Sequence, residues 1–286
     1  MYSYLVPVLG AMALGAGTIL EKIVLKEKKV NIKLYQTAIF LALVIAMLPF
    51  IWFFWRTDAA AFTITNLLIL LGVMILSIVA NLFVFYSLKW EKINHIEPAR
   101  MLEPLFTILL ALVFSYFFGT ALYERNFKII IAAIIAGVAL VLSHIRKDHL
   151  HFNKYFIAAI FGSLFFASEL VLSRLILDFY SPIAFYFMRC LGVFLISFAI
   201  FRPHFSKLSN KLKFHIFITG AIFVVFRVII YYGYTTLGVI STTLIVMLGP
   251  VFIYLFAWKF LKERLRWRNI AAAIVILAAV LYGMFG

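Results

Sequence analysis

Residues 81–104 read NLFVFYSLKWEKINHIEPARMLEP, and residues 227–250 read RVIIYYGYTTLGVISTTLIVMLGP. The two stretches align over their whole length without a gap, because the second follows the first at a constant offset of 146 positions. The matched positions include Tyr86 and Tyr232, Met101 and Met247, and Pro104 and Pro250. Similarity at one fixed offset predicts that the chain contains an internal repeat.

A second alignment extends this repeat toward the start of each half. At an offset of 152, residues 10–25 (GAMALGAGTILEKIVL) align with residues 162–177 (GSLFFASELVLSRLIL), and Lys22 falls on Arg174. We therefore expect two related halves, residues 1–145 and residues 155–286. Chance similarity between apolar segments is the competing explanation for the alignments.

The composition indicates an integral membrane protein. Of the 286 residues, 66% are hydrophobic and 13% are charged, whereas a soluble domain is nearer one half and one quarter. The net charge of +15 does not indicate nucleic-acid binding, because the basic residues lie in short connections between apolar runs. The lipid bilayer is therefore the expected partner, and no nucleic acid is expected.

Ten segments are long and apolar enough to cross a bilayer, for which about 20 residues are needed. They cover residues 3–25, 34–55, 64–88, 93–118, 128–145, 155–177, 182–201, 214–236, 240–261 and 269–285. The expected fold is thus all-α, with ten transmembrane helices in two five-helix repeats. Because five is odd, the second repeat must enter the membrane in the opposite direction, as in transporters built from inverted repeats.

The distribution of lysine and arginine predicts the orientation. Most of them fall in odd-numbered connections, as do Lys26, Lys28 and Lys29, while the even-numbered connections hold Arg56, Arg125 and Lys128. Basic residues prefer cytoplasmic loops, so both termini are expected on the outer side of the cell membrane.

The last 50 residues carry a resemblance to a known family. LGVISTTLIVMLGPVFIYLFAWKFLKERLRWRNIAAAIVILAAVLYGMFG (237–286) combines a small-residue turn, a mid-helix proline, an aromatic-rich end, a Lys-Glu turn and a small-residue final helix. This stretch resembles the closing part of EamA-type transporters of the drug/metabolite transporter (DMT) superfamily, and residues 101–142 show the same features less cleanly. The resemblance implies ten helices in two inverted repeats, transport rather than enzyme activity, and no cofactor.

The first half departs from the family pattern at two positions. An arginine common in the second and seventh helices is present as Arg189, whereas its first-half counterpart is Gln36. An acidic residue after the fourth helix is replaced by Thr120, while Glu263 keeps it in the second half.

Charged residues within the fourth apolar segment are the first candidates for a site. Glu97, Arg100 and Glu103 are spaced by three, which places them in a column on one side of a helix. Pro104 cannot donate to the carbonyl of Arg100, so a kink is expected there. Pro250, next to Gly249, predicts a similar kink in the ninth segment. We expect Pro104, Gly249 and Pro250 to act as hinges. A structural Arg100–Glu103 pair with Glu97 at the interface is the alternative.

Other polar side chains deep in apolar segments complete the predicted substrate-binding set, because such residues usually face a cavity or one another. They are Glu169, Arg189 and Arg227, joined by the matched aromatics Tyr86 and Tyr232. Lys22 and Arg174 lie near helix ends, where we expect them to reach the interface. No metal site is expected.

These features predict a secondary transporter, and by the family resemblance an exporter, for small polar organic solutes such as amino-acid-like compounds. Alternating access would take place around a central cavity. The arginines would attract an anionic group, and Glu97, Glu103 or Glu169 would take a cation or a coupling proton. An exchanger of phosphorylated or other anionic metabolites is the alternative within transport. A membrane-embedded enzyme is a further alternative, although the common enzyme motifs are absent from the sequence.

Overall fold

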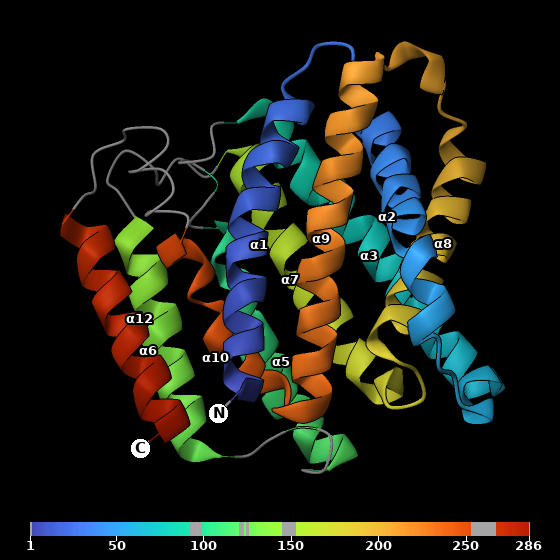
Figure 1. Ribbon diagram of the computed structural model, residues 1–286. Helices are drawn as coiled ribbons and strands as arrows, with labels where there is room; N and C mark the ends of the chain where they lie inside the picture. The colour runs from blue at the N-terminus through green and yellow to red at the C-terminus, as the bar shows by residue number, and fades with distance from the viewer. Residues whose placement is uncertain are drawn as a thin grey trace.

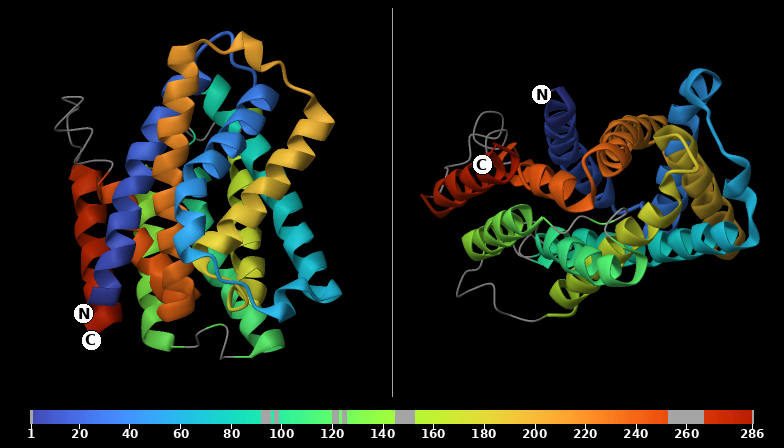
Figure 2. Two further views of the ribbon diagram at one scale, coloured as in Figure 1. Left: turned by 45° about the vertical axis from the view of Figure 1, so that its right-hand side comes forward. Right: turned by 90° about the horizontal axis from the view of Figure 1, so that it is seen from below.

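The computed structural model describes residues 2–91, 96, 99–119, 123, 126–144, 153–252 and 267–285. These residues form a bundle of roughly antiparallel helices, and the two ends of the chain lie at the same end of the bundle (Figures 1 and 2). The long helices are α1 (Tyr2–Leu25), α2 (Ile32–Phe54), α3 (Ile64–Trp90), α7 (Lys154–Leu177), α8 (Pro182–Phe201) and α9 (Asn210–Thr236). The shorter ones are η1 (Ala59–Phe62), α5 (Leu102–Phe118), α6 (Phe127–His144), η3 (Phe205–Lys207), α10 (Val239–Val246) and α12 (Trp267–Phe285).

Within the described residues, six helices are long and apolar enough to cross a membrane: α1, α2, α3, α7, α8 and α9. Four shorter apolar helices cover Leu102–Phe118, Phe127–Ala139, Val239–Phe252 and Ile270–Gly283 within the described residues. The chain is thus an all-helical, multi-pass membrane protein in the ranges given above.

Helix starts follow from local side-chain chemistry. Asn31, Asn153, Ser181 and Ser209 each precede a long helix and accept a hydrogen bond from a backbone N–H of its first turn. These bonds satisfy donors that have no partner inside the helix. Pro182 occupies the first helical position of α8, where its missing N–H costs nothing.

Helices α3 and α9 are matched in length and in the residues that precede them. Each has 27 residues, each follows a short 3₁₀ helix, and each has a hydroxyl residue at the N-cap, Thr63 or Ser209. The two N-cap residues are separated by the same offset of 146 positions that aligns residues 81–104 with residues 227–250.

Helices from the first half of the chain pack mainly against helices from the second half. The most extensive contacts are those of α3 with α7, α1 with α9, α6 with α12 and α2 with α8. The two predicted halves are therefore interleaved in space, and neither forms a separate body with a core of its own.

Glycines lie at two of these contacts, where an added side chain would not fit. A Cβ added at Gly10 of α1 would lie 2.8 Å from Cγ2 of Ile229 in α9, and one at Gly162 of α7 would lie 2.6 Å from Cγ2 of Val84 in α3. Gly10 and Gly162 are matched at the offset of 152. Both of these aligned positions thus hold a glycine at a contact between helices from different halves of the chain.

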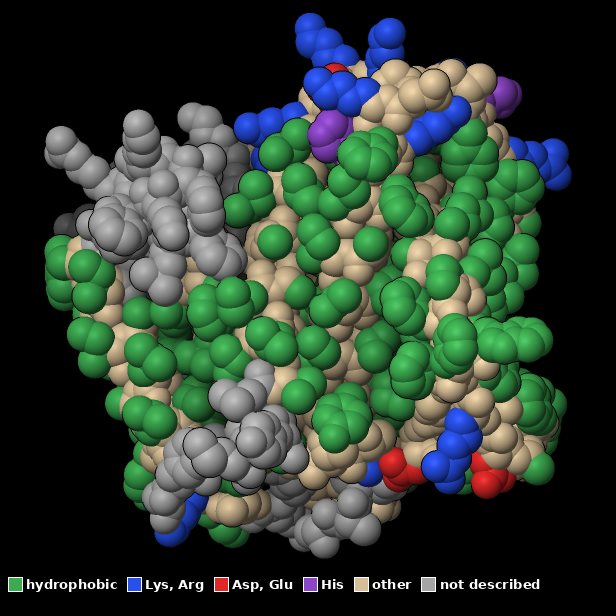
Figure 3. All heavy atoms as spheres, in the orientation of Figure 1, with side chains coloured by type: hydrophobic (Ala, Val, Ile, Leu, Met, Phe, Trp, Pro, Cys, Tyr) green, Lys and Arg blue, Asp and Glu red, His purple; other side chains and the backbone are tan. Residues whose placement is uncertain are grey.

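The outer surface has the pattern expected of a lipid-facing protein. Hydrophobic side chains cover the middle of the face drawn in Figure 3, and lysine and arginine gather at the end that carries the α1–α2 and α8–α9 connections. Trp52, Phe53 and Phe54 at the end of α2 are strongly exposed. Aromatic side chains of this kind are typical of the membrane–water interface.

Candidate functional site: a charged cavity between two broken helices

Two helices are interrupted at matched positions. Met101 lies outside regular helix between residues 99–100 and α5, and Met247 and Leu248 separate α10 from the helical residues 249–252. Each break comes just before a proline, Pro104 or Pro250, whose ring nitrogen cannot donate to the carbonyl of the residue four positions earlier. The kink predicted after Arg100 is thus present as a break at the next residue.

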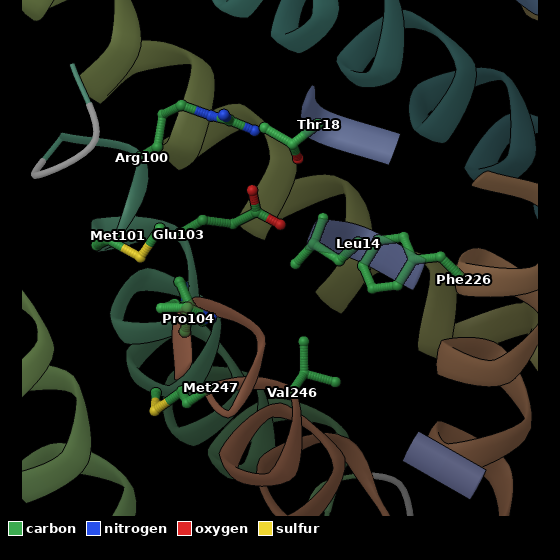
Figure 4. A pocket seen from close by; sticks show the side chains of 10 residues that line it. Leu14, Thr18, Arg100, Met101, Glu103, Pro104, Phe226, Val246 and Met247 are labelled. Atoms are coloured by element: carbon green, nitrogen blue, oxygen red, sulfur yellow. The ribbon is translucent and has the colours of Figure 1, made fainter. Parts of the chain in front are cut away.

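The two breaks meet at a cavity of about 80 Å³. Its lining includes Met101 and Pro104 from one broken helix and Met247 and Pro250 from the other. In Figure 4 the carboxylate of Glu103 and the guanidinium of Arg100 point into this space, opposite Leu14 and Thr18 of α1. Freed backbone groups at membrane depth are tolerated where they line a cavity of this kind.

A second cavity of about 90 Å³ adjoins the first, because both are lined by Leu14, Arg100, Glu103 and Phe226. Its wall adds Glu21 of α1, Asn81 of α3, Arg189 of α8 and Arg227 of α9. The two cavities together define the candidate site, which we call the charged cavity.

Glu169 of α7 is fully buried next to the charged cavity and is paired with two arginines. Its Oε1 lies 3.2 Å from Nη1 of Arg189, and its Oε2 lies 3.9 Å from Nη2 of Arg227. Removing a carboxylate and a guanidinium from water is costly, so such groups occur in membranes where they neutralise one another.

Hydrogen bonds hold this ion cluster in place. The hydroxyl of Tyr231 donates to Oε1 of Glu169 at 3.1 Å, and Oγ of Ser173 donates to the same atom at 3.2 Å. Arg189 donates from Nη1 to the Tyr231 hydroxyl at 2.6 Å and from Nη2 to Oγ of Ser77 at 2.7 Å. Helices α3, α7, α8 and α9 are thereby tied together at one level.

Aromatic rings cover the guanidinium groups of the cluster. Cζ of Arg189 lies 5.5 Å from the ring centroid of Tyr186, and Cζ of Arg227 lies 5.4 Å from that of Phe166. Phe185 packs edge-on against Tyr231 with centroids 4.9 Å apart. These contacts exclude water and strengthen the attraction between the charges.

The charges continue from the ion cluster across the cavity in alternating sign. Glu103 interacts electrostatically with Arg227 and with Arg100, and Arg100 interacts with Glu21. The resulting charge row runs in the order Arg189, Glu169, Arg227, Glu103, Arg100 and Glu21. The wall around the cavity therefore presents both signs of charge to a polar solute.

Among the residues predicted from the sequence, Arg100, Glu103, Arg189 and Arg227 line the charged cavity. Glu169 lies behind the wall, where it holds two of these arginines. Glu97 lies outside the described residues. Of the predicted hinge residues, Pro104 and Pro250 line the cavity and Gly249 packs against α1, because a Cβ there would lie 3.5 Å from the Ala11 carbonyl oxygen.

The matched tyrosines Tyr86 and Tyr232 occupy a different part of the molecule. Tyr232 is 41% exposed, and Tyr86 packs against the ring of Tyr155 with centroids 5.3 Å apart. The inward positions are one residue earlier, at Phe85 and Tyr231. One residue corresponds to about 100° of rotation around a helix, enough to turn a side chain from the cavity to the outside.

Lys22 points inward rather than reaching the interface. It is 6% exposed, and its Nζ donates to the backbone oxygens of Leu88 and Glu91 at the end of α3. Arg174 is also 6% exposed, and it forms an ion pair of 2.8 Å with Asp178 one turn later on the chain. The snorkelling predicted for Lys22 is therefore wrong in this structure.

Four residues of the site were missed at the sequence level: Glu21, Tyr35, Ser77 and Tyr231. Glu21 lies near the end of the first apolar segment, where an interfacial position is the simplest expectation, yet it is 5% exposed and lines the charged cavity. The available signal was its place in an apolar helix beside Lys22. Ser77 gives no signal, because a single serine in an apolar helix commonly bonds only to its own backbone.

Gln36, the counterpart of Arg189 in the first half, is fully buried in α2. Neither its amide nitrogen nor its amide oxygen has a hydrogen-bond partner in the structure. An amide at this position cannot form the ion pair that Arg189 makes, so the arginine–carboxylate cluster is a feature of the second half.

The described residues contain no group of three or more His, Cys, Asp or Glu side chains placed to hold a metal ion. The side chains of the histidines that cluster in the sequence, at positions 144, 149 and 151, lie outside the part of the structure that is described.

Sequence comparison identifies the second half directly. Residues 153–284 match the EamA-like transporter family. This match confirms the predicted resemblance to EamA-type transporters of the DMT superfamily over the second half of the chain. Members of this family are membrane transporters, which agrees with the apolar helices and the buried charges.

Solved structures support the same fold over the whole chain. One crystal structure aligns with 99% of this chain and 96% of its own, with a TM-score of 0.68 and 13% sequence identity. At that identity the likeness establishes the fold of the chain and leaves the solute open. No curated protein matches the chain in sequence.

Proposed function

We propose that this chain is a secondary transporter that carries a small polar organic solute, of the amino-acid-like class, through the charged cavity by alternating access. The observation that carries the proposal is the meeting of two broken helices, at Met101 and Met247, on a cavity lined by charged side chains. Broken helices that present backbone groups and charges near mid-membrane are a recurrent substrate-site design in transporters.

The inverted repeat is part of the proposal. It is supported by the equal lengths of α3 and α9, by the matched breaks, and by the matched glycines Gly10 and Gly162. It is also supported by the helix contacts, because exchanging the halves converts the α1–α9 contact into the α7–α3 contact. A protein whose halves can exchange their contacts in this way can adopt two conformations of near-equal energy, which alternating access requires.

The interleaved packing changes which bodies would move. Because α1 packs on α9 and α3 packs on α7, the moving units would be helix pairs drawn from both halves. The charged cavity lies between these pairs, since Leu14 and Arg227 face it from one and Asn81 and Phe166 from the other. The repeats taken as two rigid blocks would not separate around the cavity.

The balance of charge supports a zwitterionic solute over a phosphorylated one. Three arginines alternate with three glutamates in the charge row, so the wall does not present the excess of positive charge that a phosphate or dicarboxylate needs. Export across the plasma membrane, as the family resemblance implies, and coupling to protons complete the proposal.

The orientation proposed from loop charge places the basic end of the bundle in the cytoplasm. A reporter that is active only in the cytoplasm should give signal when fused near Lys92 and none when fused after Gly286. The reverse pattern would overturn the orientation and leave the fold unaffected.

Transport is tested with purified protein in sealed vesicles. Counterflow of radiolabelled L-leucine should exceed that of glycerol 3-phosphate, and Arg227→Gln should abolish it, because Arg227 lines the cavity between two carboxylates. Lys33→Gln, on the surface near the ring of Phe201, is the matched control and should transport normally. Accumulation of glycerol 3-phosphate alone, or loss of activity in both variants, would contradict the proposal.

A further inference from the structure

The charge row does not end in the same way on both sides. At one end, Arg189 is closed in by Glu169, Tyr231 and Ser77, each within hydrogen-bond or ion-pair distance. At the other end stands Glu21, an acidic side chain in the wall of the cavity. The row therefore ends on one side in Arg189, which has three bonded partners, and on the other side in the carboxylate of Glu21.

The three carboxylates of the row differ in how far they are neutralised. Glu169 has two arginines within 4 Å together with two hydroxyl donors. Glu103 lies between Arg227 and Arg100. Glu21 has a single cationic neighbour in the row, Arg100, and its one hydrogen bond among the described residues comes from Tyr35 at the long distance of 3.4 Å. An added cation gains most at the least neutralised carboxylate.

The surroundings of Glu21 suit an ammonium group. The phenol of Tyr35 is fully buried and held edge-on by Phe85, with ring centroids 4.9 Å apart. Its oxygen donates to Glu21 and keeps lone pairs that can accept from a third group. Phe40 and Phe85 line the same cavity and present aromatic surface, which attracts cations.

We propose that Glu21, positioned by Tyr35, binds the ammonium group of the transported solute. The inference rests on the proposed function and deepens it, because it assigns the cationic end of a zwitterionic substrate to one residue. The anionic end then faces Arg227, which lines the same cavity. The two oxygens of Glu21 can accept hydrogen bonds from an ammonium group, while Tyr35 donates to Glu21 and holds it in place.

The sequence difference between the aligned positions explains why the solute would bind in one orientation. At the position of Glu21 the second half has Ser173, and at the position of Glu169 the first half has Gly17, by the offset of 152. Each carboxylate is thus specific to its half. A cavity with a matched backbone but different carboxylates distinguishes the two ends of a solute.

The test uses four probes that differ only at the charged ends: L-leucine, N-acetyl-L-leucine, L-leucinamide and 4-methylpentanoic acid. Binding is measured on the purified full chain by thermal shift and by isothermal titration. We expect wild type to bind the two ammonium-bearing probes more tightly than the other two. Glu21→Gln should weaken the ammonium-bearing probes about ten- to a hundred-fold, the usual value of a charge-assisted hydrogen bond, and leave the others unchanged.

Two further variants guard against a folding defect. Glu21→Asp keeps the charge and shortens the side chain, so it should retain a preference for the ammonium-bearing probes at reduced affinity. Glu27→Gln is the matched control, because Glu27 is exposed in the connection after α1 and lines neither part of the charged cavity, so it should not change that preference.

The outcomes separate this inference from the proposed function. If Glu21→Gln keeps the wild-type preference, or if Glu27→Gln removes it, the assignment to Glu21 is overturned while the transport proposal stands. If wild type binds none of the four probes, the amino-acid-like substrate class is wrong, and the assignment to Glu21 is rejected with it.

Discussion

The two halves of the chain contain matched helices but place their polar side chains at different levels. In the second half, Glu169, Arg189 and Tyr231 form a buried cluster beside the charged cavity. In the first half the corresponding depth holds Gly17 and Phe85, and the strong polar contacts lie at one end of the bundle.

The first-half contacts form what we call the lysine clasp, made by Lys22 and Lys89. Lys22 of α1 donates to the carbonyls of Leu88 and Glu91 at the end of α3. Lys89 of α3 donates to the carbonyl of Leu25 at the end of α1 and to that of Val30 in the connection that follows. Each helix thus places a cation at the other's C-terminus, where the unpaired carbonyls and the helix dipole favour positive charge.

The second half lacks this exchange. The residues matched to the clasp are Arg174 and Thr235. Arg174 pairs with Asp178 at the end of its own helix, and Thr235 donates to backbone oxygens of Tyr231 and Tyr232 within α9. The difference teaches that lysines fasten the ends of α1 and α3 to each other, while Arg174 and Thr235 bond only within α7 and α9 or to the residue that follows α7.

The largest effect is expected at the buried cluster. Glu169→Leu leaves Arg189 and Arg227 without their carboxylate, and an uncompensated buried charge costs about 3–5 kcal/mol. Glu21→Gln keeps an oxygen that can accept from Tyr35 and loses the attraction to Arg100, so it should cost about 1 kcal/mol or less. The measurement is detergent denaturation of the purified variants. Equal losses of unfolding free energy in the two variants would show that Glu169 and Glu21 contribute equally to stability.

The lysine clasp should come next. Replacing Lys22 and Lys89 together by methionine keeps most of the side-chain volume and removes both cations, leaving the carbonyls of two helix ends without donors. We expect a loss of about 2–4 kcal/mol. Arg174→Met, whose partner Asp178 is half exposed, should cost no more than about 1 kcal/mol. A larger loss at Arg174 would contradict a clasp confined to one end.

Much of this architecture could be predicted from the sequence, because apolar length and proline position act locally. The predicted segment 182–201 is α8, and the segment 64–88 is α3 with two further residues. The break after Arg100 follows from Pro104, since the missing N–H acts on one identifiable carbonyl.

Side-chain depth and partners were harder to predict, because they depend on helix tilt and on which helices meet. Glu21 and Lys22 are neighbours near a helix end, and an interfacial position is the simplest expectation for both. In the structure one lines the cavity and the other caps α3, since α1 packs between α9 and the end of α3. That arrangement follows from tertiary contacts and not from the composition of α1.

A third experiment tests whether Arg100 and Glu103 bind the solute or only neutralise each other. Substitutions of this pair should change the free energy of unfolding by no more than about 2 kcal/mol. Both side chains line the charged cavity, so Arg100→Lys should abolish L-leucine counterflow because lysine lacks the planar fork that binds a carboxylate. If Arg100 only neutralises Glu103, the change to lysine is tolerated and the double leucine variant transports. A transporting double variant would assign the column to structure alone.

The smallest effects distinguish two adjacent tyrosines of α9 and so test the register of the repeat. Tyr231→Phe removes the hydroxyl that accepts from Arg189 and donates to Glu169, and should cost about 1–2 kcal/mol. Tyr232→Phe should change stability by less than about 0.5 kcal/mol, because its side chain is 41% exposed on the outside of the bundle. Denaturation of the two variants side by side decides the matter. A cost at Tyr232 that equals the cost at Tyr231 would mean that α9 is rotated by one residue, and the buried cluster of the second half would then need a different set of partners.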